Sequence, residues 1–219
     1  MKKHLSLLLL CLMALMALTA CGEKSTAQSG GQGTAQEASQ LSEYETELMA
    51  SDYAAGTHHV EINVAELGTI SVELDADTAP ITTANFCTLA EKGFYDGLTF
   101  HRIMNGFMIQ GGDPLGNGTG GASTNITGEF EANGIANDIS HKRGVISMAR
   151  ATPPNSASSQ FFIVHQDSDF LDGQYAAFGM VTDGMEIVDE VAENTPVEDN
   201  NGTVKMENQP VIESVVVVD

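Results

Sequence analysis

The sequence has few basic residues, few cysteines and no tryptophan. Its 219 residues include 9 Lys and Arg against 30 Asp and Glu, a formal net charge of -21. A chain this acidic repels phosphate backbones, which argues against nucleic-acid binding. The three cysteines, Cys11, Cys21 and Cys87, are too few and too scattered for a disulfide framework or a zinc cluster. Hydrophobic residues still make up 42% of the chain, which is enough to build a buried core.

The first 20 residues are typical of a secretory signal peptide. Lys2 and Lys3 precede an apolar run over residues 5–18, which is shorter than the roughly 20 residues that a membrane-spanning helix needs. Residues 18–21 (Leu-Thr-Ala-Cys) resemble the bacterial lipobox, in which the cysteine becomes the lipidated first residue of the mature protein. An ordinary signal peptide with a chance cysteine is the alternative. The resemblance implies a lipid on Cys21 and an extracytoplasmic protein anchored to the bacterial cell membrane.

A segment poor in large apolar residues follows the signal. Residues 22–40 contain no Val, Ile, Leu, Phe, Met or Tyr, a composition that cannot bury a face. Residues 41–50 have apolar positions at mixed spacing, which allows a helical turn or two. We therefore predict a lipidated cysteine and flexible tether over residues 21–56, and one folded domain over residues 57–219.

Most of that domain has the pattern of short strands between turns. Apolar and polar residues alternate over 59–65 and 69–74, and further strands are predicted at 99–104, 107–110, 144–149, 160–164, 177–181 and 211–218. Helical spacing predicts two helices, at 77–92 and 185–193. Eight strands and two helices indicate a mostly β fold, a closed eight-stranded antiparallel β-barrel capped by two α-helices.

Two segments of the domain place polar groups beside large apolar ones. In residues 100–113 (FHRIMNGFMIQGGD), strand alternation sets Arg102 apart from its two neighbours and brings Met108 and Gln110 to one face. In residues 159–164 (SQFFIV), the same alternation brings Gln160 and Phe162 together. If these faces meet, they form an apolar pocket with one fixed cation and two amides in its wall.

These segments, together with several others, resemble the cyclophilin family of peptidyl-prolyl cis-trans isomerases. The matching stretches are FHRIMNGFMIQGGD, the glycine-rich run 113–121, GVISMA at 144–149, SQFFI at 159–163, FLDG at 170–173 and Phe178-Gly179. Their order and approximate spacing agree over residues 57–219. The resemblance implies an eight-stranded barrel with two capping helices. It also implies catalysis of rotation about X-Pro bonds in polypeptides, with no cofactor and no metal.

The resemblance also implies a role for each matching residue. Arg102 corresponds to the catalytic arginine, and Gln110 and Gln160 correspond to pocket amides, with Gln110 grouped with Arg102 as catalytic. The walls that hold the proline ring correspond to Phe107, Met108, Phe162 and Leu171. Contacts to the residue before proline and the adjoining loop correspond to Gly118, Ala149 and Ala151. Three substrate-binding positions depart from the common family residue: Phe170 replaces Trp, Tyr175 replaces His and Arg150 replaces Asn.

Two other features invite a metal-site interpretation. His58 and His59 are adjacent, but no acid or cysteine cluster accompanies them, so a solvated strand entry explains them better. Residues 199–202 (DNNG) hint at a calcium loop, but Val197 and Asn208 stand where the first and twelfth ligands belong. A hairpin turn is the better interpretation, and no metal site is predicted.

Three further features have a structural explanation. Cys87 lies one residue past the apolar stripe of the first predicted helix, which favours a helix-flank thiol over a nucleophile. His101 is better explained as a buried barrel residue than as a base. The glycine-rich run lacks the Gly-Lys-Ser/Thr ending of a phosphate-binding loop.

The favoured hypothesis is a monomeric, membrane-tethered isomerase that helps exported proteins to fold. Its partners would be Pro-containing polypeptides and, through the lipid on Cys21, the membrane. A non-catalytic module that binds Pro-containing peptides, as a chaperone or receptor, is the alternative. A barrel that only scaffolds an envelope complex is a third.

Overall fold

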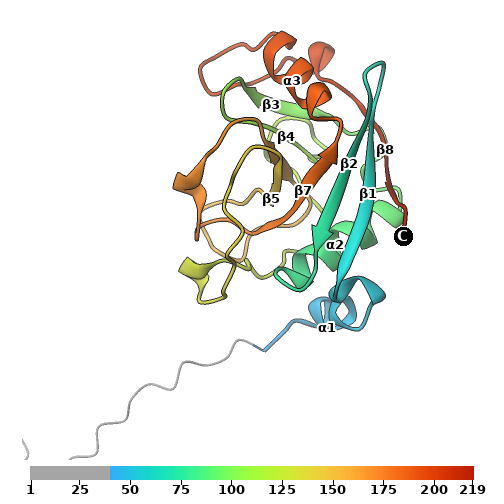
Figure 1. Cartoon of the computed structure of the whole chain (residues 1–219), viewed down its shortest axis with the longest axis vertical. Coiled ribbons are helices and arrows are strands. Elements are labelled where there is room, and N and C mark those ends of the chain that lie inside the picture. Colours follow the sequence, from blue (N-terminus) through green and yellow to red (C-terminus); the bar gives the residue numbers. More distant parts are fainter. Residues whose placement is uncertain (1–39) are drawn as a thin grey trace, which may run out of the picture. The chain divides into compact units, whose positions relative to one another are not determined.

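The computed structural model describes residues 40–219 (Figure 1). The predicted signal peptide, the lipidation site Cys21 and the tether over residues 21–39 lie outside the described residues. Within residues 40–219, none of the helices has the length and apolar character required to span a bilayer.

Eight antiparallel strands form a single sheet in the order β3-β4-β6-β5-β7-β2-β1-β8. The strands are β1 (Thr57–Val64), β2 (Gly68–Asp75), β3 (Phe100–Met104), β4 (Met108–Gly111), β5 (Val145–Met148), β6 (Phe161–Val164), β7 (Ala177–Asp183) and β8 (Ile212–Val217). All eight lie within or next to the ranges that the alternation of apolar and polar residues predicts. The mostly β, eight-stranded antiparallel prediction is confirmed.

The two edge strands of the sheet, β3 and β8, meet only where both begin. Thr99 and Val211 form an isolated antiparallel bridge, and the Phe100 amide donates to the Pro210 carbonyl at 3.0 Å. Because both strands start at this bridge and run in opposite directions from it, they separate and share no ladder. The described sheet therefore curves toward closure without β3–β8 pairing, and a fully closed barrel is not confirmed.

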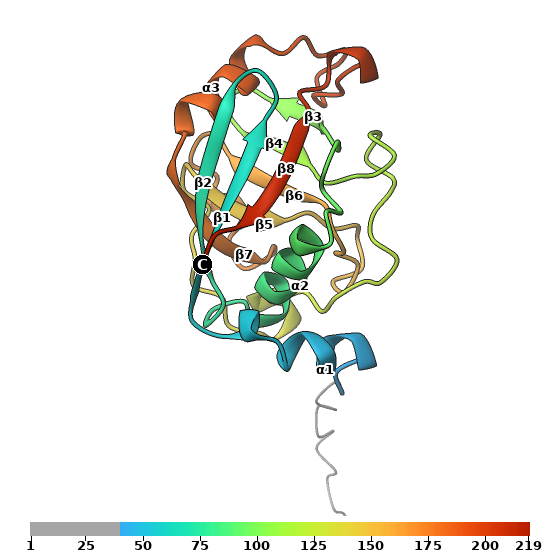
Figure 2. The same cartoon turned by 90° about the vertical axis from the view of Figure 1, so that its right-hand side faces the viewer.

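The two predicted helices are present, as α2 (Pro80–Glu91) and α3 (Met185–Asn194), at opposite ends of the curved sheet (Figures 1 and 2). Pro80 occupies the first turn of α2, where its missing N–H costs nothing. The carboxylate of Glu129 accepts hydrogen bonds from the Ile81 and Thr82 amides, at 3.0 and 2.8 Å, and so satisfies two donors that the helix cannot. Short 3-10 turns lie at η2 (Glu131–Asn133), η3 (Asp169–Leu171) and η4 (Met206–Asn208).

The core lies between α2 and the concave side of the sheet. Phe86 of α2 packs against Tyr95, Phe161 and Phe178, with ring centroids 4.9 to 5.4 Å apart. All four rings are fully buried, and burial of side chains of this size contributes about 1.5–3 kcal/mol each. Cys87 is also fully buried, so the thiol belongs to the core rather than to the helix flank.

The prediction of a flexible tether up to residue 56 is wrong over its last part. A third helix, α1 (Glu43–Met49), and a 3-10 turn, η1 (Asp52–Ala54), precede β1, and the compact unit begins at Gln40. Ser42 and Glu45 form a reciprocal capping box that starts α1. Leu48 is 2% exposed and belongs to the main hydrophobic core. The spacing of apolar residues allowed a helical turn or two here, and the seven residues of α1 make about two turns. It did not show that the segment packs on the domain, because Leu48 is the only side chain of α1 that belongs to the buried core.

Candidate active site

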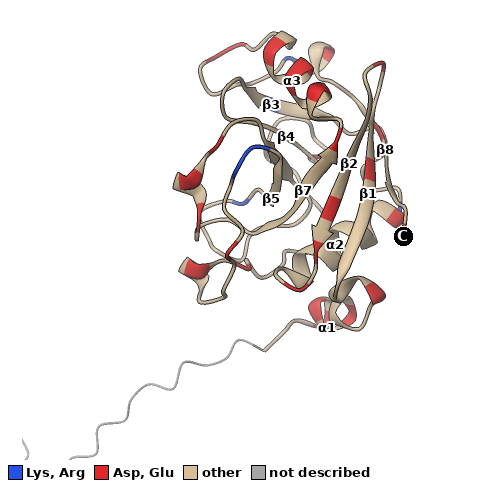
Figure 3. Cartoon of the chain, in the orientation of Figure 1, with Lys and Arg blue, Asp and Glu red and all other residues tan. Residues whose placement is uncertain are grey.

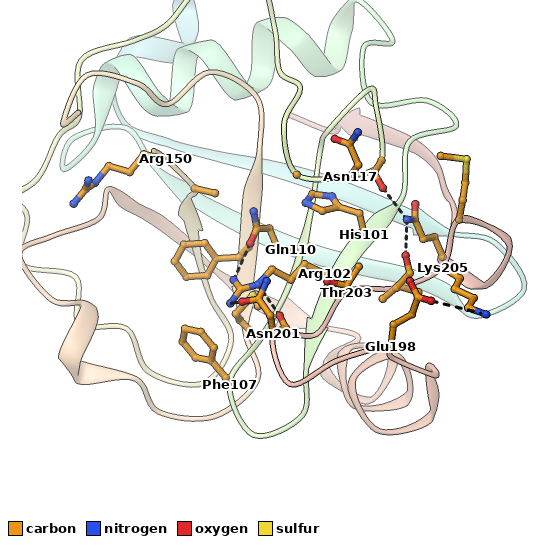
Figure 4. Close-up of a pocket in the computed structure, with 18 of the residues that line it drawn as sticks. His101, Arg102, Phe107, Gln110, Asn117, Arg150, Glu198, Asn201, Thr203 and Lys205 are labelled. Carbon is orange, nitrogen blue, oxygen red and sulfur yellow. Dashed lines mark hydrogen bonds and ion pairs between the residues drawn. The ribbon is translucent and has the colours of Figure 1, made fainter. Parts of the chain in front are cut away.

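A cavity of about 740 Å³ opens beside β3, β4 and β6 (Figure 4). Its floor and walls contain most of the residues that the family resemblance implied: Arg102, Phe107, Met108, Gln110, Gly118, Ala149, Arg150, Phe162, Phe170, Leu171 and Tyr175. The other two, Ala151 and Gln160, line a second cavity of about 360 Å³. Gln110, Gly118, Ala149 and Arg150 line both cavities, so the two form adjoining parts of one groove.

Strand register explains why the central groups meet. In the β3–β4 pair Arg102 lies opposite Gln110, and in the β4–β6 pair Gln110 lies opposite Phe162. Residues opposite one another in neighbouring strands point to the same face of a sheet. The cation, the amide and the aromatic ring therefore form one row across three strands, and the pocket predicted from strand alternation is present.

The Arg102 guanidinium is held by four hydrogen bonds. Nη1 donates to Gln110 Oε1 at 3.1 Å, and Nε donates to the Asn201 carbonyl at 2.9 Å. Nη2 donates to Asn201 Oδ1 at 3.3 Å and to Met104 Sδ at 3.1 Å. A guanidinium has five N–H groups, so these contacts leave one N–H, on Nη1. The side chain is thus fixed in place while it keeps a donor for another molecule.

A chain of amides fixes the orientation of Gln110. Its Nε2 donates to Gln160 Oε1 at 2.9 Å, and Gln160 Nε2 donates to the Gly120 carbonyl at 2.7 Å. With Nε2 engaged in this way, Oε1 of Gln110 is left to accept from Arg102. Gln160 therefore acts on Arg102 through Gln110, and links the strands to the glycine-rich loop.

No carboxylate forms an ion pair with Arg102 within residues 40–219. Its hydrogen-bond acceptors are carbonyl, amide and thioether groups, all of them neutral. Burial lowers the pKa of Arg102 below its ordinary value, but arginine remains charged at any working pH. The positive charge is consequently not cancelled by a fixed negative partner.

Apolar side chains form the rest of the main cavity. Met108, Phe162 and Leu171 belong to a second hydrophobic cluster, on the other side of the sheet from the main core, and Phe107 and Tyr175 pack against it. The Phe162 and Tyr175 rings meet edge to face at 5.9 Å. Phe170 lies 5.5 Å from Phe107 but is 66% exposed, so it borders the mouth of the cavity rather than its floor.

Arg150 holds the segment between the two cavities. Its guanidinium lies over the Phe130 and Tyr175 rings, 4.9 and 4.8 Å from their centroids. Nε donates to the Gln174 carbonyl at 2.9 Å, and Nη1 donates to the Ala151 and Thr152 carbonyls at 3.0 and 3.2 Å. In Figure 4 its side chain points away from Gln110 and Arg102. Arg150 therefore shapes the groove through the backbone and the Tyr175 ring.

Sequence reasoning missed one wall of the main cavity. Residues of the segment after α3 line it, namely Glu198, Asn201, Thr203, Val204, Lys205, Met206 and Gln209. The predicted hairpin turn is present here, because the Gly202 amide donates to the Asp199 carbonyl at 3.1 Å. Thr203 then bridges to Arg102, and the Ile103 amide donates to the Gly202 carbonyl at 2.8 Å. A contact between residues about 100 positions apart has no local signal in the sequence.

The histidines that were considered as ligands or bases have structural partners or deep burial. His58 and His59, at the start of β1, both contact the Asp219 carboxylate. His101 is 4% exposed and lies beneath the glycine-rich loop, close to Gly118. Burial lowers its pKa, which favours the neutral ring. The prediction of a solvated strand entry holds for His59, which is exposed, but is wrong for His58, which is buried where its ring contacts Asp219 and the Ala55 carbonyl. The deep burial of His101 agrees with the prediction of a barrel residue.

The family model and the similar proteins all carry the name of the same enzyme class. Residues 59–217 match the family model described as cyclophilin type peptidyl-prolyl cis-trans isomerase/CLD. The chain is 50% identical over 123 residues to peptidyl-prolyl cis-trans isomerase-like 1 of Rhizopus delemar, which covers 56% of this chain and 73% of the relative. It is 49% identical over 117 residues to peptidyl-prolyl cis-trans isomerase B of Bacillus subtilis, covering 53% and 78%.

A solved structure agrees with these matches. The crystal structure of a cyclophilin type peptidyl-prolyl cis-trans isomerase of Cryptosporidium parvum, determined in the presence of the dipeptide Ala-Pro, superimposes with a TM-score of 0.65. The two sequences are 32% identical, and the match covers 74% of this chain and 99% of the other.

Proposed function

Because the chain belongs to the cyclophilin-type peptidyl-prolyl cis-trans isomerases, we propose that it accelerates X-Pro rotation in exported proteins while tethered to a membrane by a lipid on Cys21. The bound polypeptide would place its proline ring on Phe162 and the neighbouring apolar wall. Arg102 would then lie beside the amide that rotates. The row of Arg102, Gln110 and Phe162 in one cavity is the observation that carries the catalytic part of this proposal.

The reaction breaks no covalent bond. An amide resists rotation because the nitrogen lone pair is delocalised, with a barrier of about 18–20 kcal/mol. As the bond twists, the lone pair returns to the nitrogen and can accept a hydrogen bond. The remaining N–H on Nη1 of Arg102 is the donor for that nitrogen. Because the planar amide offers no such acceptor, this bond stabilises the transition state more than the ground state, which is what raises a rate.

One hydrogen bond does not account for the whole acceleration. Uncatalysed isomerisation takes tens of seconds, so reaching a turnover of about 10³ s⁻¹ requires roughly five decades, or about 7 kcal/mol. A hydrogen bond from a charged donor contributes about 1.5–3 kcal/mol. Orientation of the peptide in the groove and exclusion of water by the apolar walls must supply the remainder.

Exchange NMR on a Pro-containing peptide tests the role of Arg102. Removal of the donor in Arg102→Ala should lower kcat/KM by about 10- to 150-fold, which is the equivalent of 1.5–3 kcal/mol. Lys92→Ala removes an exposed cation at the end of α2 and should leave kcat/KM unchanged. If Arg102→Ala is as fast as the wild type, or if the wild type gives no acceleration, the catalytic proposal is rejected.

The second candidate is a non-catalytic module that binds Pro-containing peptides, as a chaperone or receptor. The adjoining cavity of about 360 Å³ and the exposed Phe170 ring favour it, because they offer more contact surface than a single proline needs. Such a module would bind the same peptides in a titration without changing their rate of cis–trans exchange. Measurement of both quantities on one peptide separates the two candidates.

The tether and location rest on the first 21 residues of the sequence. A basic start, an apolar run and the Leu-Thr-Ala-Cys stretch at 18–21 support export and lipidation of Cys21. Cys21→Ala should move the protein from the membrane fraction to the soluble fraction, and Cys11→Ala, inside the signal, should not. A Cys21→Ala protein that stays with the membrane would refute the anchor. We also propose a monomer, for which light scattering should give the mass of one chain.

A further inference from the structure

The helix α1 lies outside the residues that match the family model, yet it is linked to both segments that form the outer wall of the second cavity, to one directly through Glu45 and to the other through Asn85 of α2. We propose that Tyr44 and Glu45 of α1 are positioning residues that fix this wall. By fixing it, they determine which residue types the groove accepts next to proline. The proposal deepens the isomerase function and rests on it. It assigns residues 40–50 a role in substrate selection.

Glu45 connects α1 to the segment that precedes β5. Its side chain is buried, with the residue 5% exposed. Oε2 accepts from the amide and the hydroxyl of Ser42, both at 2.9 Å, and Oε1 accepts from the Thr127 amide at 2.6 Å. A buried carboxylate is costly unless it is hydrogen-bonded, and these three donors supply that compensation. The position of the Thr127 backbone is therefore tied to the start of α1.

Tyr44 connects α1 to the segment that precedes β6. Its hydroxyl donates to Asn85 Oδ1 at 2.7 Å, and Asn85 Nδ2 donates to the Ser158 carbonyl at 2.6 Å. Asn85 lies on α2 and is fully buried, so its amide has little freedom to turn. The hydroxyl of Tyr44 thus selects the amide orientation that presents Nδ2 to Ser158.

The two segments also pair with each other at the cavity. The Ile126 amide donates to the Ala157 carbonyl at 2.8 Å, and the two residues form an isolated bridge. Their neighbours Asn125, Ser156 and Ser158 line the second cavity. A shift of either segment would therefore change the width of that cavity.

The rest of the cavity is fixed by other contacts. Its facing wall is the glycine-rich loop, and Gln160 links that loop to Gln110. The second cavity adjoins the main cavity, which would hold proline, because the two share Gln110, Gly118, Ala149 and Arg150. A residue adjacent to proline in a bound peptide would therefore enter the second cavity. Small and polar side chains line it, which favours small or polar neighbours of proline over aromatic ones.

The test compares Tyr44→Phe and Glu45→Gln with two matched controls. Glu47→Gln makes the same charge change on the exposed side of α1, and Tyr53→Phe removes a hydroxyl that donates to Glu91 instead of to Asn85. The substrates are X-Pro peptides in which the residue next to proline is Ser, Ala, Phe or Trp. We expect the ratio of kcat/KM for Ser over Phe to fall at least threefold in Tyr44→Phe and Glu45→Gln, and to stay constant in the controls.

Amide hydrogen exchange supplies a readout that does not depend on turnover. The Thr127 amide should exchange at least tenfold faster in Glu45→Gln than in the wild type, with no such change in Glu47→Gln. A uniform loss for all peptides, an unchanged ratio or unchanged exchange would overturn the positioning role. If the wild type binds peptides without catalysis, the isomerase proposal fails. The role of α1 is then decided by the ratio of the dissociation constants for the Ser and Phe peptides, compared between the variants and the wild type.

Discussion

The neutral surroundings of Arg102 lead to a sharp prediction for Asn201. Its Oδ1 accepts from Nη2 of Arg102 at 3.3 Å, and its carbonyl accepts from Nε. Asn201→Asp keeps the shape of the side chain and replaces an amide oxygen by a carboxylate oxygen. The change converts a neutral contact into an ion pair. The guanidinium would then be engaged by a fixed anion, and the amide of a bound peptide would have to compete with it.

The size of the effect follows from that distance. Two unit charges 3.3 Å apart attract by about 1.3 kcal/mol in water and by about 5 kcal/mol at an effective dielectric constant of 20. Asn201 is exposed, so the value in water is the better guide. At 1.36 kcal/mol for each decade, kcat/KM should fall about tenfold. Stability should stay the same or rise slightly, because an ion pair has been added.

Exchange NMR at several pH values is the suitable assay. Asn200→Asp adds the same charge at the exposed neighbouring position and should leave kcat/KM close to that of the wild type. The Arg102 guanidinium lowers the pKa of the new carboxyl, so activity of Asn201→Asp should recover only as pH falls through that lowered pKa. Equal rates for the two variants at neutral pH, or no recovery in acid, would refute the argument that an uncancelled charge matters.

Other positions give simpler tests. In Gly202→Ala, at φ 81°, the added Cβ would overlap the Ile103 carbonyl, so the free energy of unfolding in urea should fall by over 2 kcal/mol and kcat/KM should fall too. In Gly97→Ala, at φ 78°, the added Cβ meets open space, so the free energy of unfolding should fall by about 1–2 kcal/mol and activity should be kept. Burial opposes ionisation of Asp113, but N–H groups of the glycine-rich loop outweigh it and lower its pKa. The ionised carboxylate therefore stabilises the fold above about pH 4, and this stabilisation is lost in acid. The loss of unfolding free energy caused by Asp113→Asn should accordingly be smaller in acid than at pH 7. Burial raises the pKa of Cys87 to about 12, so Ellman's reagent should label it only after unfolding.

The sequence alone was sufficient to predict the features of the fold and site that depend on local periodicity. Alternation with a period of two placed Arg102, Gln110 and Phe162 on the correct faces of their strands, because register carries one row of side chains across neighbouring strands. Pro80 and the apolar stripe located α2 within a few residues. The family motifs in residues 100–173 then identified most of the groove residues on β3, β4, β6 and the glycine-rich loop, but none of the lining residues after α3.

Two features could not be found in this way, the wall after α3 and the packing of α1 on the domain, because both depend on contacts between distant parts of the chain. The wall that contains Asn201 lies beside β3 only because Thr203 pairs with Arg102 across about 100 residues. The helix α1 is seven residues long, and isolated helices of that length are unstable in water. Its stability comes from Leu48 in the core and from Glu45 on Thr127, neither of which the sequence of α1 reveals.

The distribution of charge in the described part of the chain explains how an acidic protein keeps a usable cation. Acidic residues lie on α1, α3 and the outer loops (Figure 3). Lys142 pairs with Asp167 and Asp169, and Arg143 and Lys205 each pair with one acidic residue. Asp199, on the turn beside Arg102, would be the natural partner for its guanidinium. Instead, its carboxylate accepts from the Asn201 and Thr203 amides and from the Thr203 hydroxyl, at 2.9 to 3.1 Å. The same turn that presents the neutral Asn201 carbonyl to Arg102 thus keeps the nearby anion occupied, which leaves the charge of Arg102 to act on the rotating amide.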